Sequence, residues 1–158
     1  MTANELLNLV LCVGLCFLAA AIAGRVTVRS VHDWYAALKK PSWNPPGSWF
    51  SPVWAVLYTL MGVSLWLVWQ QGGFAAAPLA MALFAVQLVL NVLWSWLFFG
   101  RHRPGLAFVE IVVLWFTILA TTLTFWRVSV LAGALLIPYL LWVAFATALN
   151  LAVWRLNA

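Results

Sequence analysis

Five long apolar stretches follow one another along this chain, and they limit its fold more than any other feature. Each reaches the ~20 residues that a helix needs to cross the hydrocarbon of a bilayer. Backbone polar groups must be paired internally there, so the stretches are predicted to be α-helices. The sequence thus predicts an all-α protein, an integral membrane bundle of five transmembrane helices forming a single domain, residues 1–158. The predicted helices span residues 6–24, 51–69, 75–99, 105–126 and 128–154.

Composition supports the same class. Hydrophobic residues make up 66% of the chain and charged residues only 7%, whereas a soluble domain is about 25% charged. The net charge is +5, but the basic residues flank the apolar stretches, so nucleic acid is not expected as a partner. The links between the last four spans are short, which favours antiparallel neighbours.

The distribution of Lys and Arg predicts the orientation. Five crossings place the first loop, the third loop and the C-terminal tail on one side, and only Arg127 lies on the other side. This bias predicts an N-terminus outside and a C-terminus in the cytoplasm, as in a bacterial inner membrane. Residues 1–8 contain no Lys or Arg, so the first span is interpreted as a retained helix rather than a signal peptide. The basic residues on the predicted cytoplasmic side are Arg25, Arg29, Lys39, Lys40, Arg101, Arg103 and Arg155.

The first loop, residues 25–50, is unusually rich in rings; we call it the Trp/Pro loop. Four tryptophans and four of the seven prolines fall within residues 34–54. Proline removes backbone donors and interrupts helices, and Pro45-Pro46-Gly47 is typical of a turn. We therefore expect a long, non-helical loop that folds against the bundle.

Polar and aromatic residues recur at helical spacing in three spans and converge beneath this loop. Such a cluster of flat rings with few polar groups is typical of a ligand cavity. Interfacial belts and simple packing explain tryptophans equally well, and Gln87 and Asn91 could equally bond neighbouring helices. The three stripes are Trp54, Tyr58, Met61 and Leu65; Gln87, Asn91, Trp94 and Phe98; and Pro138, Trp142, Ala146 and Asn150.

The remaining polar candidates are few. Glu110 is the only acid well inside a span, and an intramembrane carboxylate is a functional candidate by default. Because it lies about 9 Å from the predicted helix end, we expect it to reach the interface or pair with Arg101 or Arg103. His32 and His102 lie on different loops, so no metal site is predicted. Four small residues form a ridge suited to close helix packing, within the bundle or between subunits: Cys12, Cys16, Ala20 and Gly24.

Several segments in this order resemble the tryptophan-rich sensory protein and translocator protein family, also called peripheral-type benzodiazepine receptors. The most specific is WYAALKKPSWNPPG at residues 34–47. The others are residues 52–58, 87–95, 98–100 and 138–150. The resemblance covers most of the chain and far exceeds a general likeness to five-helix proteins.

The resemblance implies a five-helix bundle, a homodimer, and a pocket covered by the first loop. It implies binding of tetrapyrroles such as protoporphyrin IX, with no cofactor required; some members bind cholesterol or synthetic benzodiazepine and isoquinoline ligands. Members occur in bacterial and mitochondrial outer membranes, so that location stays open. The segment 149–155 lacks the tyrosine of the animal cholesterol motif, which argues against tight cholesterol binding. The implied ligand-binding residues are Tyr35, Trp54, Asn91, Trp94, Trp142 and Ala146.

Three functions are compatible with these features. The leading hypothesis is a porphyrin-binding receptor or sensor that regulates tetrapyrrole metabolism or a stress response. The second is light-dependent porphyrin degradation, in which Trp54 and Trp142 would be the catalytic pair; the chain holds no nucleophilic, metal or paired-carboxylate motif for ordinary catalysis. The third is transport of tetrapyrroles or sterols, for which no inverted repeat is visible.

Overall fold

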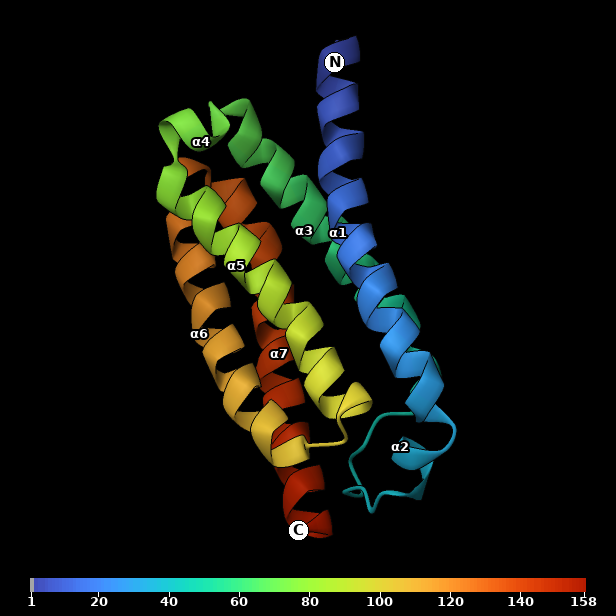
Figure 1. The fold of residues 1–158 in the computed structure, drawn as a ribbon. Helices are drawn as coiled ribbons and strands as arrows, with labels where there is room; N and C mark the ends of the chain where they lie inside the picture. The colour runs from blue at the N-terminus through green and yellow to red at the C-terminus, as the bar shows by residue number, and fades with distance from the viewer. Residues whose placement is uncertain (1) are drawn as a thin grey trace.

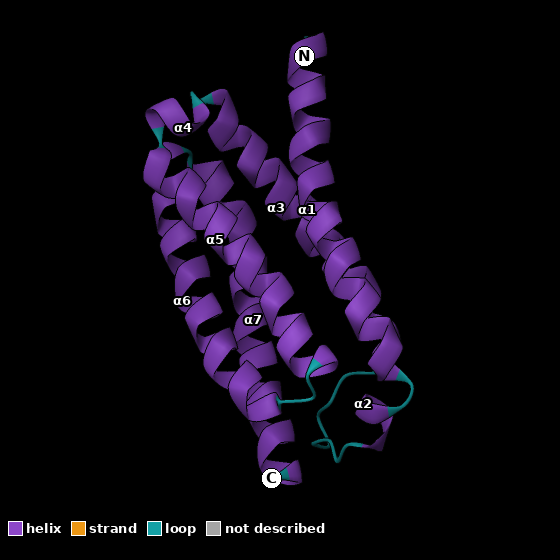
Figure 2. Ribbon diagram, in the orientation of Figure 1, coloured by secondary structure: helices purple, strands orange, loops and turns teal. Residues whose placement is uncertain are grey.

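The computed structural model describes residues 2–158 and contains five long helices (Figure 1). All five are long and apolar enough to cross a membrane, and no strand occurs in residues 2–158, as the purple helices of Figure 2 show. The prediction of an all-α, five-helix membrane bundle is therefore confirmed. The long helices are α1 (Ala3–Val31), α3 (Phe50–Gln70), α5 (Pro78–Ser95), α6 (Pro104–Val128) and α7 (Val130–Asn157).

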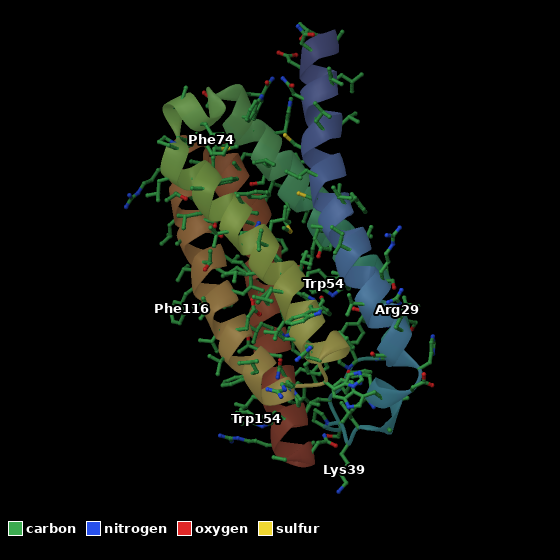
Figure 3. All side chains as sticks on the ribbon, viewed as in Figure 1. Arg29, Lys39, Trp54, Phe74, Phe116 and Trp154 are labelled. Carbon is green, nitrogen blue, oxygen red and sulfur yellow. The ribbon has the colours of Figure 1, made fainter. Side chains whose placement is uncertain are left out.

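The five helices form a closed ring. Contacts run from α1 to α3, then to α7, α6 and α5, and back to α1. Large apolar side chains such as Phe116 and Leu141 are exposed on the outside of this ring, where they would face lipid; Figure 3 shows Phe116 pointing away from the bundle. The buried side chains lie inside the ring and between neighbouring helices, so the site must be sought there.

The first helix is longer than predicted. It begins at Ala3, where Thr2 and Glu5 form a capping box, and continues to Val31 instead of ending at residue 24. Because no proline follows Gly24 until Pro41, nothing interrupts the helix, and its last two turns carry Arg25 and Arg29. The Trp/Pro loop is correspondingly shorter and comprises residues 32–49, not 25–50.

The Trp/Pro loop is also not fully irregular, contrary to expectation. Trp34–Ala37 forms one helical turn, α2, and Gly47–Trp49 forms a 3₁₀ turn, η1. The prolines lie between these turns and after them, which keeps each of them short.

The ends of α5 also differ from the predicted span of residues 75–99. α5 begins at Pro78 rather than residue 75, because Gly72 and Gly73 have positive φ and a separate turn, α4 (Gly73–Ala76), precedes the helix. Beyond Ser95, α5 continues as a π-helical segment, η2 (Trp96–Gly100). α7 runs through Pro138 without a break.

One end of the bundle collects the Trp/Pro loop, the η2–α6 connection and the C-terminus (Figure 1). The loop is tied to α7 there: the Lys39 N–H donates to Asn157 Oδ1 at 3.0 Å, and Asn157 Nδ2 donates to the Lys39 carbonyl at 2.9 Å. We call this the loop end. The N-terminus and α4 lie at the opposite end (Figure 1). This grouping agrees with the predicted topology, while the cytoplasmic assignment of the loop end stays a prediction.

Candidate functional site

A chain of hydrogen bonds crosses the centre of the ring. The Tyr58 hydroxyl donates to Asn91 Oδ1 at 2.6 Å, and Asn91 Nδ2 donates to the Tyr139 hydroxyl at 2.8 Å. The Tyr139 hydroxyl in turn donates to Gln87 Oε1 at 3.0 Å. We call these four residues, all buried, the central polar chain. In a membrane interior no water competes for such groups, so the chain joins α3, α5 and α7 at mid-depth.

Asn91 is therefore occupied by helix–helix bonding. Its Oδ1 accepts from Tyr58 and one N–H of its Nδ2 donates to Tyr139, so only the second N–H of Nδ2 is left as a donor for a ligand. Gln87 differs, because its Nε2 has no hydrogen-bond partner. Gln87 thus offers an NH2 group with two free N–H donors at the end of the central polar chain.

Trp54 and Trp142 meet on the loop-end side of the central polar chain. Their rings are 6.4 Å apart between centroids and nearly perpendicular, at 88°. Trp54 also packs on Tyr58 and, at 6.3 Å, on Tyr139. Figure 3 shows Trp54 pointing into the bundle. The two tryptophans that share stripes with other candidates are thus in direct contact within the ring.

Trp142 also retains a free polar atom. Its Nε1 is buried without a hydrogen-bond partner, and Phe50, at the start of α3, packs edge-on against its ring at 5.9 Å. An indole N–H usually finds a partner when it is buried. The pair therefore presents both an aromatic face and a free donor.

Trp94 is fixed by two contacts. Its Nε1 donates to Asn150 Oδ1 at 3.0 Å, and its ring stacks on Phe98 at 5.3 Å. Asn150 Nδ2 then donates to the Pro104 carbonyl at 2.7 Å, where α6 begins. Trp94 consequently links α5, α6 and α7 near the loop end, and its indole offers a ring edge rather than a free donor.

Tyr35, on α2, brings the Trp/Pro loop onto the bundle. Its ring packs against Phe99 at 5.5 Å and Phe98 at 6.1 Å, and Lys40 Nζ lies 4.7 Å above it. The Tyr35 hydroxyl donates to Asn44 Oδ1 at 3.2 Å. Burial raises the pKa of this hydroxyl, which therefore remains a neutral donor at physiological pH.

The candidate residues form two neighbouring groups. The first group contains Trp54, Trp142 and Asn91, which is linked to Trp54 through Tyr139. The second group contains Tyr35 and Trp94, whose rings both pack against Phe98. Ala146 is half-buried and packs against the main apolar core. The rings expected to enclose a ligand contact one another, so a flat ligand would bind only if they separate.

Tyr139 is the site residue that the sequence reasoning missed. The stripe chosen on α7 began at Pro138, which is exposed, whereas Tyr139 is 1% exposed and takes part in two bonds of the central polar chain. A usable signal was its depth: Tyr139 is ten residues into α7, too far from either end for an interfacial belt.

The expectation for Glu110 was wrong. This residue is only 8% exposed, and neither carboxylate oxygen has a hydrogen-bond partner. Arg101 instead lies over the Trp96 ring. Glu110 lies on the buried face of α6, three residues after Ala107 and four residues before Leu114, which are also buried.

Comparisons with known proteins agree with this architecture. The sequence pattern of the TspO/MBR family matches residues 12–155. The chain is 44% identical over 159 residues to the tryptophan-rich protein TspO of Chlorobaculum tepidum, covering 98% of each chain. It is 44% identical over 146 residues to the human translocator protein, covering 89% of this chain and 86% of that protein.

A third relative is the tryptophan-rich sensory protein of Cereibacter sphaeroides, which is 39% identical over 145 residues, 90% of each chain. These matches extend over all five membrane helices and the Trp/Pro loop, and they confirm the resemblance seen in the sequence. The chain therefore belongs to the TspO/MBR family.

Proposed function

We propose that this protein is a membrane receptor for a flat, hydrophobic tetrapyrrole such as protoporphyrin IX, and that it acts as a sensor in tetrapyrrole metabolism or a stress response. The observation that carries the proposal is the contact between Trp54 and Trp142 beneath the Trp/Pro loop. If the two indole rings separate, the flat ring system of a ligand can bind between them. The Cereibacter sphaeroides relative is named a tryptophan-rich sensory protein, which supports the same role.

The binding residues have distinct roles in this proposal. Trp54, Trp94 and Trp142 supply aromatic surface, and Ala146 leaves room beside them. The buried Nε1 of Trp142 lacks a partner and would donate to a polar atom of the ligand. Tyr35 closes the site from the loop, while Asn91 holds its floor in place.

The ligand's carboxylates would lie toward the loop end. Arg29 and Lys39 are exposed there, and Figure 3 shows the Lys39 side chain extending away from the bundle. Lys40 is less available, because its Nζ donates to the carbonyls of Ala36 and Leu38. Arg29 and Lys39 are therefore the better partners for an anion.

The test is a titration of protoporphyrin IX into the protein in detergent, followed by the porphyrin absorbance band. A double variant, Trp54→Ala with Trp142→Ala, should weaken binding at least about tenfold, since each aromatic contact contributes on the order of 1 kcal/mol. The matched control, Trp69→Ala with Trp126→Ala, removes two exposed tryptophans far from the site. Equal affinity in wild type and the Trp54/Trp142 variant would overturn the assignment.

The same contact supports a second function, light-dependent porphyrin degradation. The two indoles are electron-rich and lie beside the proposed macrocycle, so either could donate an electron to its excited state, with dissolved O2 as the oxidant that loss of the porphyrin requires. Illumination should then remove porphyrin absorbance and yield a new product. Trp142→Phe should slow this loss even at porphyrin concentrations that saturate both the variant and the wild type in the dark. Bleaching at the same rate without protein would exclude the reaction.

A further inference from the structure

Glu110, on the buried face of α6, has no role in the packing or in the ligand contacts proposed above. It is buried, and neither carboxyl oxygen has a hydrogen-bond partner in residues 2–158. Burying a carboxyl without such a partner costs free energy, because its lost hydration is not replaced. An ionisable side chain kept inside a membrane bundle at this cost is a candidate for ligand binding, since a ligand would supply the missing partner.

Two hydrogen bonds fix the depth of Glu110 relative to α7. Asn150 Nδ2 donates to the Pro104 carbonyl at 2.7 Å. Trp115 Nε1 donates to the Leu140 carbonyl at 3.2 Å. Because α6 and α7 are antiparallel and Glu110 lies about midway between these two bonds, it is level with residues 144 and 145 of α7. The proposed ligand-binding residues within one turn of that level are Trp142 and Ala146.

The direction of the Glu110 side chain follows from its neighbours on α6. Phe108 packs on Trp154 and Trp115 bonds to the Leu140 carbonyl, so these two residues mark the side of α6 that contacts α7. Glu110 is about 140–160° around the helix from both, at 3.6 residues per turn. Since Glu110 is buried and α5 is the other neighbour of α6 in the ring, it lies on the part of the buried face nearer α5.

The contacts between α5 and α6 give its level on α5. The Arg103 N–H donates to the Leu97 carbonyl at 3.1 Å, and deeper in the bundle the rings of Phe84 and Phe125 stack at 5.6 Å. Glu110 lies about a third of the way along α6 from the first contact to the second, so it is level with residues 91–94 of α5. The proposed binding residues there are Asn91 and Trp94.

The Glu110 carboxyl also has a hydrogen-bonding character that the rest of the interior lacks. Among the buried side-chain atoms without a partner in residues 2–158, its two oxygens are the acceptors, whereas the other three atoms belong to N–H donors. A ligand group that donates a hydrogen bond inside the bundle is therefore matched by Glu110 and not by those three groups. The three donors are Trp66, Gln87 and Trp142.

A metal-free porphyrin carries such donors at its centre, where two of the four inner nitrogens bear N–H groups. Its carboxylates extend from one edge of the macrocycle, so with these at the loop end the centre lies deeper in the bundle. Glu110 is six residues after the start of α6 at Pro104, which is about 9 Å along the helix. A similar distance separates the carboxylates of protoporphyrin IX from its inner nitrogens, so the centre of the ring and Glu110 share one depth.

We propose that the Glu110 carboxyl accepts hydrogen bonds from the inner N–H groups of the bound macrocycle, and that it thereby selects a metal-free tetrapyrrole. This inference rests on the proposed receptor function. The carboxyl approaches one face of the ring from α6, between Trp94 of α5 and Trp142 of α7. A macrocycle whose metal has replaced both inner protons and takes no axial ligand leaves the carboxyl unpaired, and an unpaired buried group weakens binding.

The test compares protoporphyrin IX with palladium(II) protoporphyrin IX, which has the same ring and carboxylates but no inner N–H and no axial ligand. Each is titrated into the full-length protein in detergent, and the Kd is measured by quenching of tryptophan fluorescence. Wild type should bind the metal-free porphyrin about fivefold more tightly, the effect of one net hydrogen bond. Glu110→Leu should lose this preference by weakening the binding of the metal-free porphyrin alone.

Two further variants separate recognition from structure. Glu110→Gln retains a carbonyl acceptor and should keep the preference for the metal-free porphyrin. Thr122→Val removes another buried polar group of the same helix, whose hydroxyl bonds only to the Ile118 carbonyl, and it should also keep the preference. Circular dichroism checks that each variant is folded.

The outcomes distinguish this inference from the proposed function. Equal affinity of wild type for the two porphyrins would overturn the role of Glu110 and leave the receptor proposal standing. The same preference in Glu110→Leu as in wild type would also overturn it, and would indicate that the carboxyl bonds only to internal water. If wild type binds neither porphyrin, the proposed function fails, and this inference fails with it.

Discussion

Trp94 and Asn150 join α5 to α7 through a hydrogen bond of 3.0 Å from the indole N–H to the amide Oδ1. Asn150 extends this link to α6 by donating to the Pro104 carbonyl at 2.7 Å. Three helices are thereby fixed at the loop end, directly beside the rings proposed to bind ligand. A single amide side chain thus controls the geometry of one wall of the site.

Replacing Asn150 should therefore destabilise the bundle. Asn150→Leu keeps similar volume but leaves the Trp94 N–H and the Pro104 carbonyl without their partners. We expect a loss of about 1–2 kcal/mol in the free energy of unfolding, the upper range for polar contacts between membrane helices. Thermal unfolding in detergent measures it. Thr147→Val is the control, because that hydroxyl bonds only within its own helix, to the Val143 carbonyl. Equal effects in both variants would contradict the linking role.

The central polar chain should be equally sensitive at Tyr139. Tyr139→Phe removes one hydroxyl and leaves Asn91 Nδ2 and Gln87 Oε1 unpaired, so we expect a loss of about 1–2 kcal/mol. Because Tyr139 and Gln87 share a bond, combining Tyr139→Phe with Gln87→Leu should cost less than the sum of the two. Strict additivity in the double-mutant cycle would show that the bond contributes nothing.

Replacing Glu110, in contrast, should raise the stability of the bundle. A buried carboxyl with no hydrogen-bond partner lowers stability, since its lost hydration is not replaced. Glu110→Leu should therefore raise the unfolding temperature, by an amount that corresponds to about 1–3 kcal/mol. Val109→Leu, at an exposed neighbouring position, controls for added bulk. A lower unfolding temperature for Glu110→Leu would mean that the carboxyl has a stabilising partner.

The close approach of α1 and α3 gives a steric test. A Cβ on Gly62 would lie 2.6 Å from the Val13 Cα, a backbone atom that cannot move without shifting α1. Gly62→Ala should therefore destabilise the protein by 1 kcal/mol or more, on the order of other overpacked cores. Gly14→Ala adds the same methyl group on α1, where nothing lies within 4 Å, and should be neutral. If both variants unfold at the wild-type temperature, the helices are less tightly packed than the structure indicates.

The sequence was sufficient for the architecture because hydrophobic length is a local property. Five apolar stretches gave five helices, and the Trp54 stripe through Tyr58, Met61 and Leu65 does face inward. In the ridge from Cys12, Cys12 and Cys16 are buried within the bundle, whereas a Cβ added at Gly24 would meet nothing within 4 Å. The close approach of α1 to α3 occurs instead at Gly62. Which helix faces a small residue depends on tertiary packing.

The site was less predictable than the architecture, because it too depends on tertiary packing. Helical spacing alone could not decide whether Pro138 or Tyr139 starts the inward stripe of α7, since the two differ by one position. Nor could it show that Asn91 bonds two tyrosines from other helices, or that Arg101 lies over Trp96 and leaves Glu110 unpaired. These relationships join residues far apart in the chain, and they arise only once the helices are arranged as a ring.

The link between the Trp/Pro loop and α7 provides a last prediction, which rests on the proposed function. Asn157 makes two hydrogen bonds to the Lys39 backbone, and these hold the loop over the site. Asn157→Ala should free the loop and accelerate both association and release of protoporphyrin, measured by stopped-flow absorbance. The unfolding temperature should change little, because these bonds are exposed and exposed bonds contribute little net stability. Asn4→Ala, at the other end of the bundle, is the control. Unchanged rates in Asn157→Ala would show that the loop does not limit access, so that the ligand reaches Trp54 and Trp142 from between the helices instead.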